Sequence, residues 1–219
     1  FSISPIPLPP EYHQFADQRS FLGISHTLDV LSNFGFLVVG ILGIRFIKAN
    51  TIPFKNSWLV FFGGVFLVAF GSSFYHLAPD HYRLVWDRLP MTLGFMGLFV
   101  GLISDVFHKS CEKFLLLPMN ILGVGSVWYW YYTETIGLGD QRFYAWVQAM
   151  PLLFVLVTFM LFPKLLKVNK NFYFLLSFLL YFGAKVLEKF DEEIFVMSAY
   201  VISGHSLKHV VAAVATYLI

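Results

Sequence analysis

Two histidines near the C-terminus, His205 and His209, stand at a spacing that suits metal binding. On a helix, residues four apart lie on one face about 6 Å from each other, so both side chains can reach one ion. The alternative is a hydrogen-bonded pair inside a helix bundle. The surrounding segment is apolar, however, and ionisable residues in membrane spans are costly and usually functional. A zinc site needs at least one further protein ligand.

The best candidate for that third ligand is His76, which ends the sequence Gly-Ser-Ser-Phe-Tyr-His. Ser72 lies four residues earlier, on the same face of a helix, where its hydroxyl can hydrogen-bond a water held by the metal. The simpler interpretations are an interfacial histidine and a serine bonded back to a helix carbonyl.

An acid follows eleven residues after His76, in the sequence Asp87-Arg-Leu-Pro-Met. Asp87 beside a metal is a candidate general base, which takes a proton from water and delivers it to a leaving amine. It is equally a candidate helix cap, because an acid before a first-turn proline is a common start signal.

The composition predicts a membrane protein. Of 219 residues, 58% are hydrophobic and only 13% are charged, whereas soluble domains carry about 25% charged residues. The net charge of +2 lacks the basic density that nucleic-acid binding needs. Cys111 is the only cysteine, which excludes an intramolecular disulfide and a thiolate metal cluster.

Seven apolar segments follow an N-terminal arm formed by residues 1–28, within which we expect an interfacial helix near Glu11–Phe21. A membrane span needs about 20 apolar residues, and tilt accommodates longer ones. We therefore expect an all-α fold in which residues 29–219 form one seven-helix transmembrane domain. Its segments are Asp29–Ile47, Ser57–Ala78, Asp87–Phe107, Phe114–Tyr132, Phe143–Phe162, Phe172–Leu187 and Ile194–Ile219.

Charge in the connecting loops predicts the orientation. The first, third and fifth loops carry the excess of positive charge, with Arg45, Lys48, Lys55, Lys109, Lys113, Lys164, Lys167 and Lys170. Positive loops stay in the cytoplasm. The N-terminus is therefore expected outside and the C-terminus in the cytoplasm.

Together these residues resemble the signature of the alkaline ceramidases. The resemblance consists of Ser72-x-x-x-His76, Asp87 with the Leu-Pro-Met that follows Arg88, and His205-x-x-x-His209. The ceramidases belong to the CREST superfamily of seven-helix membrane hydrolases, which also includes the adiponectin and progestin receptors. The predicted orientation is similar to that of ceramidases and opposite to that of the adiponectin-type receptors.

The resemblance implies the function. His76, His205 and His209 would hold Zn²⁺, and Asp87 and Ser72 would contact the attacking water. The chain would be a metal-dependent amidohydrolase that cleaves a ceramide or another N-acyl lipid into a fatty acid and a sphingoid-type amine. It would be a multi-pass integral membrane protein of the bacterial inner membrane or, in a eukaryote, of the endoplasmic reticulum or Golgi.

Two positions depart from the family pattern. Animal ceramidases bind calcium through an acid-rich N-terminal stretch, but here Asp17 is followed by Arg19. Calcium takes six or more oxygen ligands, so we do not expect a calcium site. Lys208 stands where ceramidases tend to have an aromatic residue. A lysine within a span must pair with an acid, bind a lipid phosphate or carboxylate, or snorkel to the surface.

The depth of the site is a further constraint. His76 lies at the outer end of its segment, whereas His205 lies eleven residues after Ile194, about 16 Å along a helix. They meet only if the last helix protrudes outward or the connection after Pro79 lies above the site. His81 is the best spare ligand.

Three functions remain open: a ceramidase-like hydrolase, a hydrolase of a non-sphingolipid acyl amide or ester, and a zinc-containing receptor or sensor of the adiponectin-receptor type.

Overall fold

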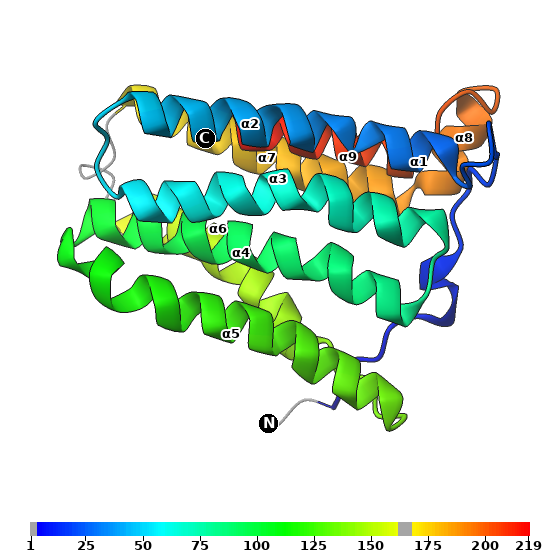
Figure 1. Ribbon diagram of the computed structural model, residues 1–219, viewed down its shortest axis with the longest axis horizontal. Helices are drawn as coiled ribbons and strands as arrows, with labels where there is room; N and C mark the ends of the chain where they lie inside the picture. The colour runs from blue at the N-terminus through cyan, green and yellow to red at the C-terminus, as the bar shows by residue number, and fades with distance from the viewer. Residues whose placement is uncertain (1–3, 162–167) are drawn as a thin grey trace.

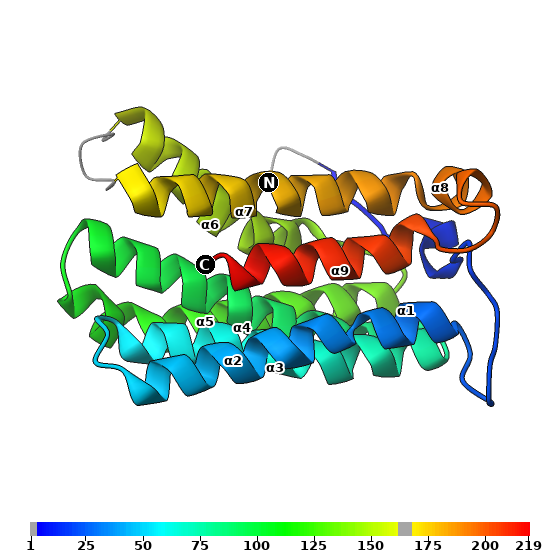
Figure 2. The same ribbon diagram turned by 90° about the horizontal axis from the view of Figure 1, so that it is seen from above.

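The computed structural model describes residues 4–161 and 168–219. This part of the chain is helical, with a lone β-bridge between Phe21 and Ile24 as its only extended pairing, so the all-α prediction is confirmed. A short 3₁₀ turn, η1 (Pro10–His13), precedes the α-helices, whose axes run side by side in a bundle (Figure 1, Figure 2). They are α1 (Thr27–Ser32), α2 (Phe34–Ala49), α3 (Lys55–Leu77), α4 (His81–Val106), α5 (Ser110–Thr135), α6 (Arg142–Leu161), α7 (Val168–Lys189), α8 (Asp191–Met197) and α9 (Gly204–Tyr217).

Within the described residues, four stretches are long and apolar enough to cross a membrane, namely Thr27–Ala49, Lys55–Leu77, His81–Val106 and Ser110–Thr135. Large apolar side chains point outward from them, as with Phe46, Phe114 and Leu117, which are 61–70% exposed. Such a surface suits lipid contact and not water. Of the basic residues used to predict orientation, Lys164 and Lys167 lie outside the described residues, as does the side chain of Lys170.

Helix α4 begins six residues before the predicted segment. Asp80 is its N-cap, with a side chain that accepts a hydrogen bond of 2.7 Å from the backbone N–H of Arg83. Asp87 therefore lies inside the helix, and its interpretation as a cap is wrong. The polar residues at 80–83 made this turn look like a loop, although Asp80 satisfies the free N–H groups of the first turn.

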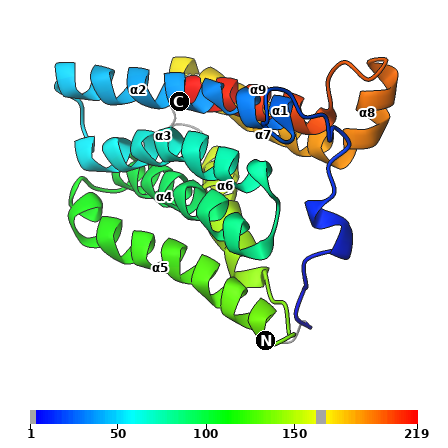
Figure 3. The same cartoon turned by 45° about the vertical axis from the view of Figure 1, so that its right-hand side comes forward.

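The N-terminal arm contains no interfacial helix at Glu11–Phe21; only the single turn η1 forms there. Instead, the arm runs past the end of the bundle toward α8 (Figure 3), held by specific contacts. Arg19 donates to both carboxylate oxygens of Asp17, at 2.8 and 2.7 Å, and to the Val201 carbonyl at 2.9 Å. Burial raises the pKa of Asp17, but the hydrogen bonds and charge of Arg19 outweigh it and hold that pKa below its ordinary value.

The last predicted segment, Ile194–Ile219, is not one helix. Helix α8 ends at Met197, the backbone turns through left-handed residues at Ala199 and Tyr200 with φ of 55° and 61°, and α9 begins only at Gly204. Ser203 is the N-cap that starts α9, because its hydroxyl accepts from the Ser206 N–H at 3.0 Å. The apolar composition of Ile194–Ile219 does not indicate this break between two helices.

Helices α3 and α4 pack closely through glycine. A Cβ added at Gly71 of α3 would lie 2.1 Å from the Trp86 carbonyl oxygen of α4. Pro90, four residues after Trp86, has no N–H, so that carbonyl lacks its ordinary helical partner. Gly71 thus lets α3 pack closely against α4 at the turn where Pro90 interrupts the hydrogen bonds of α4.

We expect Gly71→Ala to destabilise the bundle by about 1–3 kcal/mol, because the added methyl group forces α3 and α4 apart. Gly63→Ala is the matched control on the same helix, where nothing lies within 4 Å of an added Cβ. That variant gains helix propensity and should be neutral or slightly stabilised. Thermal unfolding in detergent micelles measures both, and equal melting temperatures would contradict this account of the packing.

Candidate metal centre

Three histidines from two helices converge at one end of the bundle. His76 lies in the last turn of α3, and His205 and His209 lie in the first two turns of α9. One ligand nitrogen from each lies within 4.8 Å of the other two. The depth constraint is met because α9 begins at Gly204, which puts His205 at the level of His76 without any protrusion of the last helix.

The geometry fits a metal ion bound through the Nε2 atoms. Nε2 of His76 and Nε2 of His205 are 3.2 Å apart, whereas two ligands of a tetrahedral zinc at 2.0–2.1 Å are about 3.3 Å apart. All three side chains are buried, with 1–6% exposure. Three imidazoles suit zinc, and also copper, iron and nickel, so the group is able to hold a metal ion without selecting one element.

Ser32 orients His209. The Ser32 hydroxyl lies 2.8 Å from Nδ1 of His209 and donates its proton to the Asp29 carbonyl at 3.0 Å. Since a hydroxyl has one proton, Ser32 accepts from the Nδ1–H of His209. This contact assigns the proton to Nδ1 and leaves the Nε2 lone pair free for a metal, as in ligands held by a second hydrogen bond.

Asp29 ties the start of α9 to α1. Its carboxylate is fully buried and accepts from the Ser206 hydroxyl at 2.6 Å and from the Ser203 hydroxyl at 3.4 Å. On the other side, Asp191 accepts from the His205 N–H at 2.6 Å and from the Ala16 N–H at 2.9 Å. In the sequence, Asp29 stands at the boundary of a predicted segment, and an acid beside an apolar run is a signal of a buried role.

Phe15 of the N-terminal arm covers the histidines. Its ring centroid lies 4.4 Å from that of His205 and 4.7 Å from that of His76. His26 adds a further contact, with its Nδ1 3.0 Å from the His76 carbonyl oxygen. Phe15 and His26 could not be assigned to the site from the sequence. They reach it only because the N-terminal arm folds over the end of the bundle.

The two predicted catalytic residues lie beside the histidines. The Ser72 and Asp87 side chains lie close together, on α3 and α4, in the same small pocket. Both side chains line a small pocket with His209, and Asp87 also lines the larger pocket that contains His205. Asp87 is not a member of the three-histidine group, but it lines pockets with two of the histidines.

Lys208 pairs with an acid on another helix, which is one of the three alternatives that its position predicted. It forms an ion pair with Glu188 of α7, and the Lys185 ammonium donates to the other carboxylate oxygen at 2.8 Å. Two lysines share one carboxylate, which leaves a net positive charge beside Asp87.

His81, the predicted spare ligand, is not in the group. Its Nδ1 lies 3.1 Å from Nε2 of His13, whose Nδ1 lies 2.8 Å from the Tyr75 hydroxyl. Burial and the neighbouring His81 lower the pKa of His13. This chain of contacts attaches the arm to α3 and α4.

No family model, curated protein or solved structure matches the chain. The fold and the site alone therefore define its class: a helical protein with membrane-length helices and a buried three-histidine group next to a carboxylate.

We expect His209→Ala to lose bound metal and Ser32→Ala to bind it about 10–100-fold more weakly, because the serine fixes the ligand tautomer. His81→Ala is the control and should keep the wild-type metal content. Elemental analysis by mass spectrometry, with competition against a chelator, gives the three values. Loss of metal in the His81 variant, or full retention in the His209 variant, would contradict the assignment.

Proposed function

We propose that this protein is a zinc-dependent intramembrane hydrolase that cleaves the amide bond of a ceramide-like lipid into a fatty acid and a sphingoid-type amine. The observation that carries the proposal is the position of the Asp87 carboxylate, which lies beside Ser72 and lines pockets that also contain His205 and His209. A metal site with a purely structural role does not need such an acid.

Each residue has a role in this reaction. Zinc, when bound, lowers the pKa of water and polarises a carbonyl. Asp87 accepts the proton of the attacking water and returns it to the amine nitrogen as the C–N bond breaks. Ser72, which lines the same small pocket, orients the carboxylate, and Phe15 shields the histidines from bulk water.

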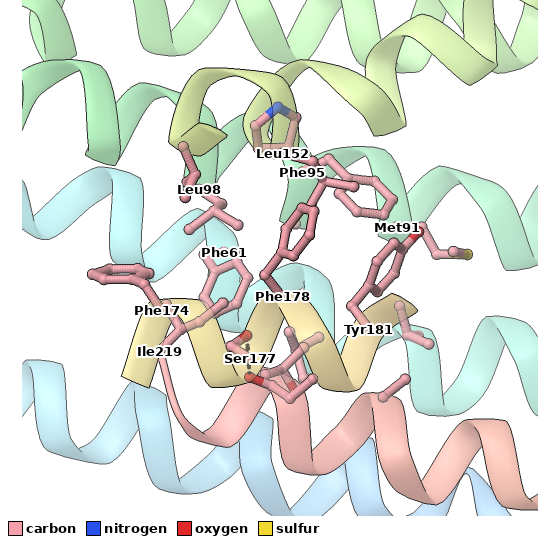
Figure 4. Close-up of a pocket in the computed structure, with 18 of the residues that line it drawn as sticks. Phe61, Met91, Phe95, Leu98, Leu152, Phe174, Ser177, Phe178, Tyr181 and Ile219 are labelled. Carbon is pink, nitrogen blue, oxygen red and sulfur yellow. Dashed lines mark hydrogen bonds between the residues drawn. The ribbon is translucent and has the colours of Figure 1, made fainter. Parts of the chain in front are cut away.

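An apolar cavity extends from this site into the bundle and suits an acyl chain. It is lined almost entirely by apolar side chains of α3, α4, α6, α7 and α9, among them Phe61, Leu98, Phe174 and Phe178 (Figure 4). The small pocket at Ser72 and Asp87 shares Met91 and Tyr181 with this cavity. A chain that enters at the metal can therefore continue into apolar surroundings.

A polar vestibule of about 720 Å³ opens on the other side of Asp87. Its walls carry six carboxylates and two lysines, which are Glu11, Asp87, Glu188, Asp191, Glu192, Glu193, Lys189 and Lys208. The amine product is a cation at neutral pH, and an acidic vestibule attracts it. The fatty-acid carboxylate instead faces the excess positive charge of Lys185 and Lys208.

We further propose seven spans, with the N-terminus outside and the C-terminus in the cytoplasm, in the bacterial inner membrane or in the endoplasmic reticulum or Golgi of a eukaryote. The histidine site and the arm then lie on the outer side. The excess of lysine and arginine in the loops at the opposite end supports this orientation.

Cys111 tests the orientation, because it is the only cysteine and lies partly exposed in the first turn of α5. In intact cells or right-side-out vesicles, a membrane-permeant maleimide should label it and an impermeant one should not. A Ser4→Cys variant of the Cys111→Ser protein places the cysteine on an exposed residue of the arm and should be labelled by both reagents. Labelling of Cys111 by the impermeant reagent would reverse the proposed topology.

We expect Asp87→Asn to retain zinc and lose at least about 100-fold in turnover, which is the scale of general acid–base catalysis. Asp105→Asn, at the opposite end of α4, is the control and should keep both. The assay measures fatty acid released from ceramide, from other N-acyl amines and from an ester of equal chain length. Zinc binding without release from any amide or ester would refute the hydrolase and favour the receptor function.

A further inference from the structure

Tyr181 carries a buried hydroxyl that has no hydrogen-bond partner among the described residues. It lies on α7 and lines both the apolar cavity and the small pocket that contains Ser72, Asp87 and His209. Its ring meets that of Phe95 edge-on, with the centroids 6.0 Å apart, and Figure 4 shows it near Met91. The hydroxyl is therefore placed at the junction between the proposed reaction centre and the proposed acyl-chain cavity.

The other hydroxyl-bearing residues that line this cavity in the described part of the chain are satisfied. Ser177 donates to the Ala215 carbonyl at 2.7 Å, as the dashed line in Figure 4 shows, and Thr216 donates to the Ala213 carbonyl at 2.8 Å. A buried hydroxyl without a partner is costly, and phenylalanine would fill the same space without that cost. We therefore infer that the hydroxyl of Tyr181 has a role other than packing.

The neighbouring polar groups on the same face of α7 do not use this hydroxyl. Lys185, one turn further along, donates to Glu188, and Glu188 is shared with Lys208. The tyrosine hydroxyl thus marks the boundary between this charged cluster and the apolar cavity. A ligand atom that accepts its proton must belong to a molecule that is polar at the junction and apolar beyond it.

We propose that Tyr181 is a specificity-determining residue that selects acyl chains bearing a hydroxyl group on the second or third carbon. The inference rests on the proposed hydrolase function, which puts the scissile carbonyl beside Asp87 and the acyl chain in the apolar cavity. The first carbons after the carbonyl then pass Tyr181, and a hydroxyl there accepts its hydrogen bond. The partner belongs to the acyl half of the substrate and not to the amine half, because Tyr181 does not line the vestibule.

The test compares zinc-loaded protein on three amides that share one sphingoid base and one chain length: plain acyl, 2-hydroxyacyl and 3-hydroxyacyl. The wild type should cleave one hydroxylated amide with a kcat/KM at least about tenfold above the plain one, which is the effect of one hydrogen bond worth about 1.4 kcal/mol. Tyr181→Phe should bring this ratio close to one. Tyr173→Phe, an exposed tyrosine on the same helix, should keep the wild-type ratio.

Equal cleavage of all three amides by the wild type would overturn the inference and leave the hydrolase function standing. A Tyr181→Phe variant that loses the same factor on all three would assign the residue to packing alone and would also overturn it. Equilibrium binding of the matching free fatty acids gives a readout independent of turnover. If no amide is cleaved, the hydrolase function fails, and the ratio of hydroxylated to plain acid binding in wild type and Tyr181→Phe still decides the role of Tyr181.

Discussion

The arrangement of the site depends on the place where the last helix begins. If α9 continued from α8 as one helix, His205 would lie more than two turns further along that helix than Met197, where α8 ends. Instead, Ser203 and Asp191 take up the free backbone N–H groups of the first turn of α9, and Asp29 holds that turn against α1. These hydrogen bonds bring three imidazoles from α3 and α9 together, and the proposed chemistry follows from that convergence.

The polar groups around the histidines form a layer across an otherwise apolar bundle. Asp29 and Ser32 come from α1, Ser72 and His76 from α3, Asp87 from α4, Glu188 from α7 and Lys208 from α9. Buried polar groups are tolerated when they satisfy one another, and here most of them do. Among the described residues, one carboxylate oxygen of Asp29, Nδ1 of His76 and the hydroxyl of Tyr181 are exceptions. The first two lie around the histidines, and the third lies at the mouth of the apolar cavity.

This layer separates two compartments of opposite character. The vestibule under the N-terminal arm is acidic, whereas the cavity between α4, α6, α7 and α9 is apolar. A lipid amide has the same asymmetry, with one half that becomes a cation and one half that is a hydrocarbon chain. The proposed hydrolysis would separate these two halves at the boundary between the compartments, where Asp87 and Lys208 lie.

The sequence by itself determined the all-helical class and the apolar segments. It also singled out the three histidines that the structure brings together, His76, His205 and His209, and the neighbouring Ser72 and Asp87. Composition and i, i+4 spacing are local properties, so they can be read without a structure. The sequence did not locate the start of α4 or the break before α9. Hydrogen bonds to Asp80, Asp191 and Ser203 set these two helix starts, and the apolar pattern does not reveal them. Only the tertiary structure decided which groups surround the histidines. Phe15, Asp29, Ser32 and Glu188 are distant in sequence, and packing alone brings them to the site.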